Sequence, residues 1–210
     1  MPTTWTKPQH ILSENRKCGA SIDLPIEGHC CSTPHCKADC YARVGFQAFP
    51  ASKRKQRWVS DYLAQSDLSQ LIIECKTHTS IRLNGSGDLN QTHLLNIIRL
   101  ARLLPTTMFW GMTRKPNVAS FLNTRVLPNL KMLLSVDSSS PSTVWNYQGP
   151  MCYGPRRHND TVPDDQRIIT IFPTHKQGKV KDTVPPEAKD CPAVRHQVSG
   201  CLECNRCSSW

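Results

Sequence analysis

The stretch TSIRLNGSGDLNQTHLLNIIRLARLL, from Thr79 to Leu104, decides the fold class of this chain. Residues 79–84 have the composition of a short buried strand, which ends in the turn Gly85-Ser86-Gly87-Asp88. Helical periodicity follows from residue 90 to residue 104. Strand, glycine-rich turn and helix in this order form a βα unit. The glycines let a ligand approach the backbone, and Asp88 places a carboxylate at the same rim.

The same alternation continues toward the C-terminus. We predict strands at residues 107–112, 130–136 and 167–172 and a helix at residues 117–127, after a helix or helix pair that begins near residue 52. Repeated βα units predict a parallel sheet, because parallel strands need crossover connections. Residues 151–165 are interpreted as a surface loop, and residues 174–190 as a loop or an edge hairpin.

Polar residues lie in or directly after several predicted strands. Because the carboxyl ends of parallel strands meet at one edge of a sheet, we expect these residues to line one cleft. The candidate substrate-cleft residues are Arg82, Asp88, Thr113 and Asp137.

Four cysteines near the C-terminus, Cys191, Cys201, Cys204 and Cys207, form a CPx8CxxCxxC pattern. Four thiolates in so short a span are typical of a metal site, since each CxxC turn brings two sulfurs to one point. Disulfides are disfavoured because the chain opens MPTTWTKPQH, without an apolar signal segment. The overlapping CxxC turns and the Cys191-Pro192 step favour a [4Fe-4S] cluster over zinc. We expect this segment to lie over the strand-end cleft.

A second cysteine group lies at residues 29–42, where Cys30, Cys36 and Cys40 follow a Cx5Cx3C pattern and Cys31 is a substitute for Cys30. Three thiolates can hold three irons of a cubane cluster and leave the fourth open for a ligand. The alternative is a zinc loop completed by Cys18, His29 or His35. The spacing leaves open whether the two cysteine groups form one site or two.

The length, the cysteine content and the net charge of the chain indicate which classes of partner are possible. The chain has 210 residues, eleven cysteines and a formal net charge of +10, which allows a polyanionic partner such as nucleic acid. A run of basic residues could contact phosphates, although such runs more often form a solvated face. This basic run consists of Lys53, Arg54, Lys55 and Arg57.

Two other classes lack their sequence signals. No apolar run is long enough for a transmembrane helix, and no GxSxG, HExxH or P-loop motif is present.

Three motifs in this order resemble the phage "gene product eighty-eight" domain family: CCSTPHCKADCYAR at residues 30–43, RLNGSGDL at residues 82–89, and an aromatic strand ending in Thr113 and a basic residue. The family has a cysteine-rich CYAR segment, an RIHxSGD-like turn and a YTK-like strand end, although Met112 replaces the tyrosine here. This resemblance implies a phage or mobile-element origin, and hence the host cell cytoplasm as the location.

A weaker resemblance is to radical S-adenosylmethionine enzymes. These enzymes place a three-cysteine loop after the first strand of a partial (β/α) barrel and a glycine-rich turn after the second strand, which is the order seen here. Their usual spacing is Cx3Cx2C, from which Cx5Cx3C departs. The resemblance implies S-adenosylmethionine as a second cofactor.

The expected fold is therefore α/β. It is a single domain over residues 1–210, a partial (β/α) barrel-like parallel sheet with an irregular cysteine-rich segment at residues 190–210. The expected function is [4Fe-4S] binding with a redox or electron-transfer role toward a redox partner. The alternatives are a radical S-adenosylmethionine-like enzyme and a zinc-stabilised nucleic-acid-binding protein.

Overall fold

A computed structural model describes residues 7–15, 18–157, 159–173, 175–176, 179–180, 189–192, 201–204 and 206–207. Within these residues seven strands form one sheet in the order β1-β2-β3-β4-β5-β6-β7. The β1–β2 pair is antiparallel, and every neighbouring pair from β2 to β7 is parallel. The strands are β1 (Ser13–Asn15), β2 (Gly19–Ile22), β3 (Ser80–Leu83), β4 (Met108–Thr113), β5 (Leu130–Val136), β6 (Met151–Arg156) and β7 (Ile168–Pro173).

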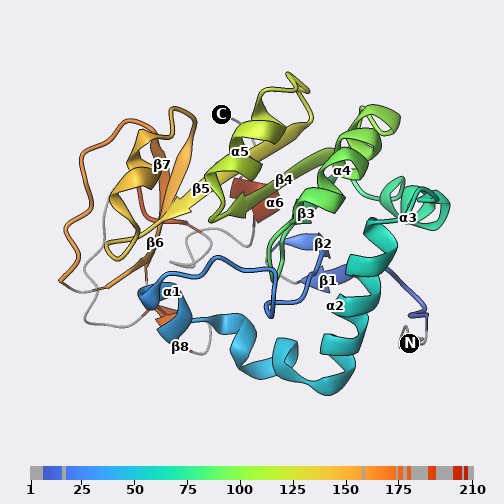
Figure 1. Cartoon of the computed structure of the whole chain (residues 1–210), viewed down its shortest axis with the longest axis horizontal. Coiled ribbons are helices and arrows are strands. Elements are labelled where there is room, and N and C mark those ends of the chain that lie inside the picture. Colours follow the sequence, from blue (N-terminus) through green and yellow to red (C-terminus); the bar gives the residue numbers. More distant parts are fainter. Residues whose placement is uncertain are drawn as a thin grey trace.

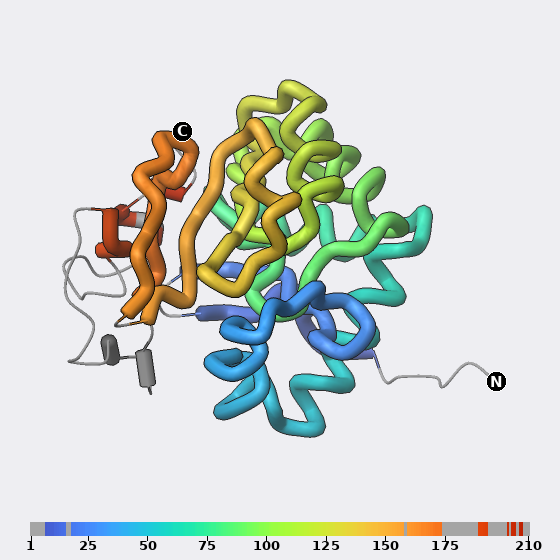
Figure 2. The backbone as a smooth tube through the Cα atoms, turned by 60° about the vertical axis from the view of Figure 1, so that its left-hand side comes forward, coloured from blue at the N-terminus to red at the C-terminus, as the bar shows by residue number. Residues whose placement is uncertain are grey.

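Helices lie between consecutive strands from β2 to β6. Figures 1 and 2 show α4 and α5 on one side of the sheet and the terminal helix α6 on the other. The α-helices are α1 (Pro34–Ala38), α2 (Pro50–Leu63), α3 (Ser69–Cys75), α4 (Gln91–Leu103), α5 (Pro116–Asn123) and α6 (Cys201–Cys204), and the 3-10 helices are η1 (Tyr41–Arg43), η2 (Gly45–Ala48) and η3 (Ser142–Asn146).

Side-chain alternation along the strands separates a core face from a cavity face. On β3, Ile81 and Leu83 are fully buried in the main hydrophobic cluster, whereas Arg82 between them lines a cavity. On β4, Phe109 belongs to the same cluster while Trp110 and Met112 line the cavity. Helices α4 and α5 therefore cover the outer face, and polar and sulfur-bearing side chains collect on the inner face.

The α/β prediction and the parallel sheet are confirmed. Strands β2 to β7 follow one another in both sequence and space, which gives an open, partial barrel-like sheet. The predicted helix pair corresponds to α2 and α3, and the interpretation of residues 174–190 as an edge hairpin agrees with an antiparallel pair of short strands. These are β8 (His175–Lys176) and β9 (Lys179–Val180).

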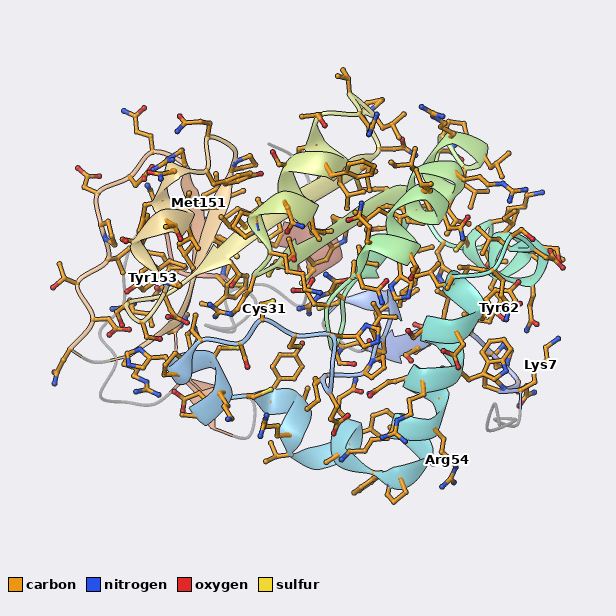
Figure 3. All side chains as sticks on the ribbon, in the orientation of Figure 1. Lys7, Cys31, Arg54, Tyr62, Met151 and Tyr153 are labelled. Carbon is orange, nitrogen blue, oxygen red and sulfur yellow. The ribbon has the colours of Figure 1, made fainter. Side chains whose placement is uncertain are left out.

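The interpretation of residues 151–165 as a surface loop is wrong for its first six residues. They form β6, which pairs in parallel with β5 and β7. Met151, Cys152 and Tyr153 are fully buried there. Gly154 allows this packing, because a Cβ at that position would lie 2.8 Å from the backbone oxygen of Phe172 on β7. Met151 and Tyr153 are labelled on this strand in Figure 3.

The terminal cysteine segment is held beside β7. Asp190 forms a parallel bridge with Ile171, and the Cys191 amide donates to the Ile171 carbonyl at 2.7 Å. The four residues of α6 form one helical turn in a segment expected to be irregular. Residues 193–200 and 208–210 lie outside the described residues, as does most of the basic stretch at residues 174–189.

Candidate functional site

The inner face of the sheet holds a cavity of about 370 Å³. This volume is in the range of small-molecule sites. The cavity brings both predicted cysteine groups together, since its wall includes nine of the eleven cysteines. These are Cys18, Cys30, Cys31, Cys36, Cys40, Cys191, Cys201, Cys204 and Cys207.

The three-cysteine loop follows β2 at the carboxyl edge of the sheet. It enters α1 through Thr33, whose hydroxyl oxygen accepts a hydrogen bond from the Cys36 amide at 3.1 Å. The same hydroxyl donates to Asp137 Oδ2 at 2.5 Å, just past the end of β5. This double contact explains how the loop is fixed over the strand ends. Cys31 lies on the part of the loop that leads into α1 (Figure 3).

Two thiols of this loop have raised pKa values. Burial raises the pKa of Cys30 to about 12, and the Asp88 carboxyl and the nearby thiols of Cys36 and Cys40 add to the shift. Burial also raises the pKa of Cys36, against the opposing charge and hydrogen bond of Arg114. A raised pKa keeps the thiols of Cys30 and Cys36 protonated near pH 7, and binding of a metal ion would favour their ionised form.

Arg114 connects the loop to the strand ends. Its guanidinium forms an ion pair with Asp137 at 2.9 Å and donates to the Gly154 carbonyl at 2.6 Å. The Asp137 side chain is fully buried, and burial opposes its ionisation. The hydrogen bond from Thr33 and the charge of Arg114 nevertheless hold the pKa of Asp137 below its ordinary value. Asp137 therefore acts through Arg114 and is not itself part of the cavity wall as described.

Asp88 is positioned by the glycine-rich turn after β3. Gly87 has a φ of +67°, and a Cβ there would lie 2.4 Å from the Leu24 carbonyl oxygen, so the turn packs directly on the loop after β2. Asp88 Oδ1 accepts from the Thr113 hydroxyl at 2.7 Å and from Asn84 Nδ2 at 3.1 Å. Burial raises the pKa of Asp88 to about 6. The ends of β3 and β4 therefore meet at one buried carboxyl group.

The terminal cysteines lie beside the middle of the strands, whereas we expected them over the strand ends. The Cys191 amide bonds to Ile171 within β7, and the charge of Arg82, in the middle of β3, acts on both Cys201 and Cys207. Burial raises the pKa of Cys207, and the neighbouring thiols of Cys152 and Cys191 raise it further. The two cysteine groups thus line different parts of one cavity.

Two further cysteines lie close to the terminal group although the sequence did not assign them to it, and of these two Cys18 lines the cavity. Cys18 lies with its Sγ 3.5 Å from Cys201 Sγ, 183 positions along the chain. Cys152 is fully buried on β6, and burial raises its pKa to about 11. No local motif contains either residue, so only the register of the sheet could have revealed them.

Other sequence candidates lie outside these groups. His29 Nδ1 contacts the Asp88 carbonyl at 3.3 Å, and its ring stacks on His93 at a centroid distance of 5.7 Å. His35 Nδ1 lies 2.9 Å from Ser138 Oγ. Cys75 is fully buried in α3, as expected of a packing residue. Within the described part of the chain, no three His, Cys, Asp or Glu side chains are arranged to hold one metal ion, and the thiols are distributed around the cavity.

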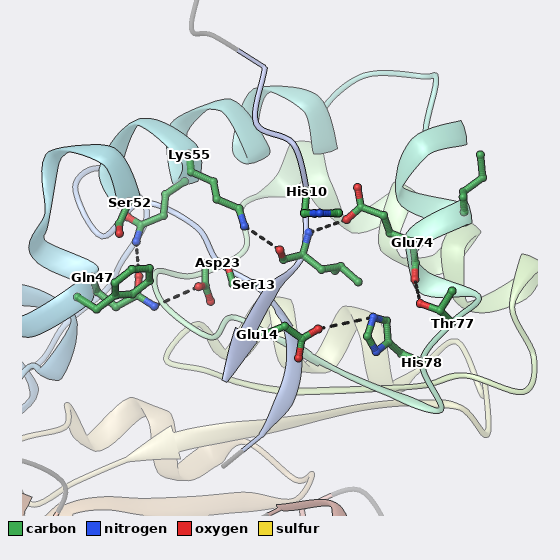
Figure 4. A pocket seen from close by; sticks show the side chains of 14 residues that line it. His10, Ser13, Glu14, Asp23, Gln47, Ser52, Lys55, Glu74, Thr77 and His78 are labelled. Carbon is green, nitrogen blue, oxygen red and sulfur yellow. Dashed lines mark hydrogen bonds and ion pairs between the residues drawn. The ribbon is translucent and has the colours of Figure 1, made fainter. Parts of the chain in front are cut away.

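A second cavity of about 630 Å³ lies between α2, α3 and β1 (Figure 4). Lys55 of the basic run lines it and donates to the Leu12 carbonyl at 2.7 Å. Glu74 accepts from the amides of Ile11 and Leu12 at 2.8 and 3.0 Å. Lys53 pairs with Glu27 at 3.5 Å. At least two of the four basic residues, Lys53 and Lys55, are therefore engaged within the chain, and no cysteine lines this cavity among the residues described.

The fold and the site define an α/β protein with a partial barrel-like sheet and a thiol-walled inner cavity. The chain belongs to the bacteriophage-associated Gene product 88 family, whose family model matches residues 4–209. No curated protein and no solved structure matches the chain significantly. Every helix in the described ranges is too short or too polar to cross a bilayer.

Proposed function

We propose that this protein binds a [4Fe-4S] cluster through its terminal cysteines and has a redox or electron-transfer role in the cytoplasm of an infected host. The observation that supports the proposal is that Cys191, Cys201, Cys204 and Cys207 all line the same cavity. Cys191 reaches this wall from the edge of β7, and the others from α6 and the residues after it. A bound cluster would supply one-electron transfer at this wall.

The charges of the cavity support the same proposal. A cluster held by four thiolates is anionic, and burying it requires compensating positive charge. Arg82, Arg114 and Arg206 line the cavity, and Arg206 is fixed by a hydrogen bond from Nη1 to the Asp190 carbonyl at 2.9 Å. The chain therefore supplies both the donor type and the counter-charge that such a cluster needs.

A second candidate is a radical S-adenosylmethionine-like enzyme. It is favoured by the strand order, because the three-cysteine loop follows the first parallel strand, β2, and the glycine-rich turn follows the second, β3. Asn84 Oδ1 and Thr170 Oγ1, in the cavity wall, are buried without a hydrogen-bond partner in the described structure. Such atoms suit a polar ligand. Substrate would then lie between Arg82, Asp88 and Thr113, with Asp137 holding Arg114 in place.

The test is the metal content of anaerobically purified protein. Iron and acid-labile sulfide in equal amounts, with the broad visible absorption of a cluster, are the expected result. Colourless protein with stoichiometric zinc would overturn the proposal in favour of a zinc-stabilised protein, and salt-dependent retention on oligonucleotides would then test nucleic-acid binding. A change in the electron paramagnetic resonance signal of the reduced protein on adding S-adenosylmethionine would support the enzyme candidate, and no change would count against it.

A further inference from the structure

Cys18 lies immediately before β2 and is 5% exposed. Close polar neighbours of its Sγ include Cys201 Sγ at 3.5 Å and the Nη1 of Arg82, which donates to it at 3.1 Å. The two sulfurs are in contact without being bonded, and both line the cavity. The terminal thiol group of the fold is therefore larger than the CPx8CxxCxxC motif.

Arg82 is held in place from the opposite side. Its guanidinium lies over the Trp110 ring at 5.7 Å, and the indole N–H of Trp110 donates to Ser80 Oγ at 3.0 Å. The Nε of Arg82 is buried with no hydrogen-bond partner among the described residues. The guanidinium is thus fixed with one N–H directed at the Cys18 sulfur.

We propose that Cys18 is a thiolate ligand of the terminal metal centre and that Arg82 is a positioning residue that donates a hydrogen bond to the ligand sulfur. This inference rests on the proposed function and extends its ligand set. With Cys18 the group offers five thiols, one more than a four-thiolate cluster uses. One of the four cysteines predicted from the motif is then not required for binding.

The test of Cys18 is iron and acid-labile sulfide per folded chain after anaerobic reconstitution of Cys18→Ser. The matched control is Cys75→Ser, which makes the same change at a fully buried thiol in α3, outside the cavity. We expect Cys18→Ser to lose about four iron atoms per chain relative to wild type, and Cys75→Ser to lose none. Single serine variants at the four motif cysteines should include one that keeps its iron. Circular dichroism checks that each variant is folded.

Retention of wild-type iron and an unchanged paramagnetic signal in folded Cys18→Ser would overturn the assignment of Cys18 and leave the proposed function standing. Wild-type protein without iron and sulfide would overturn both. The two failures are thus distinguishable.

The role of Arg82 is tested separately, by the reduction potential of the bound cluster in two Arg82 variants. Arg82→Gln removes the charge near the cluster ligands, whereas Arg82→Lys keeps it. Because the positive donor stabilises the more negative, reduced state, Arg82→Gln should keep its iron but show a more negative potential, and Arg82→Lys should restore most of the wild-type value. A purely structural role would change stability and leave the potential unchanged, and that result would overturn the assignment.

Discussion

The buried ion pair between Arg156 and Asp190 offers a quantitative test of how the terminal cysteine segment is held. Arg156 Nη2 lies 3.3 and 3.2 Å from the two Asp190 carboxylate oxygens, and the two side chains are 1% and 4% exposed. Asp190 directly precedes Cys191 and forms the bridge to Ile171. The pair therefore connects β6 to the start of the terminal segment.

Asp190→Asn keeps the shape of the side chain and removes its charge. Removing one partner of a buried pair costs about 3–5 kcal/mol, because the remaining charge stays desolvated. This is a roughly hundred- to several-thousand-fold loss in the folding equilibrium. The measurement is urea denaturation of the reduced, metal-free chain, followed by circular dichroism.

Two controls accompany this experiment. Arg156→Met with Asp190→Leu removes both charges and should recover most of the lost stability, since an apolar pair of similar volume carries no desolvation penalty. Lys53→Met breaks the exposed pair with Glu27, whose side chains are 40% and 53% exposed, and should cost less than about 1 kcal/mol. A loss of under about 1 kcal/mol for Asp190→Asn would refute the reasoning.

Three further substitutions test local features of the fold. Gly87→Ala should lower the free energy of unfolding, measured by urea denaturation, by about 3 kcal/mol or more, because it adds a collision with the Leu24 carbonyl to a positive φ. The control Gly45→Ala, at φ +64° with open space around it, should lower it by only about 1 kcal/mol. Equal losses in the two variants would contradict this explanation. Val126→Asn should raise stability by roughly 0.5–1 kcal/mol, since Val126 is 86% exposed at φ 50°, and a loss would count against strain there. Burial lowers the pKa of His93 to about 4. Between about pH 6.5 and pH 4 the unfolded chain therefore binds a proton that the folded chain does not, and up to about 3 kcal/mol of stability should be lost as the pH falls through this range. His93→Gln should reduce this pH dependence of the unfolding free energy, measured by denaturation at several pH values, and an unchanged pH dependence would exclude His93 as its cause.

The βα units were predictable because their signals are local. Residues 79–104 carry a strand, a glycine turn and a helix, and the observed β3 and α4 differ from the predicted bounds by one residue at each end. Asn90 explains the helix start, because its side chain accepts from the Thr92 amide at 3.1 Å. Such information lies within a few residues of the element it specifies.

Features that depend on contacts distant in sequence were not predictable. β6 has the sequence MCYGPR, whose glycine and proline usually end a strand, and packing against β7 decides its conformation. Cys18 shares no motif with Cys201, and only the fold brings them together. The position of Asp88 and Thr113 at one edge of the sheet was predictable, because parallel strands present their carboxyl ends on one edge whatever the partners of their side chains.

The most direct test of the iron–sulfur proposal is the iron and sulfide content of Cys201→Ser/Cys204→Ser, compared with wild type and with Cys30→Ser/Cys36→Ser. The proposal predicts equal iron and sulfide in the wild type and a loss of about four of each per chain in the terminal variant. Replacement of the loop cysteines should leave this terminal content in place. Unchanged iron in the folded terminal variant, or zinc in place of iron in the wild type, would contradict it.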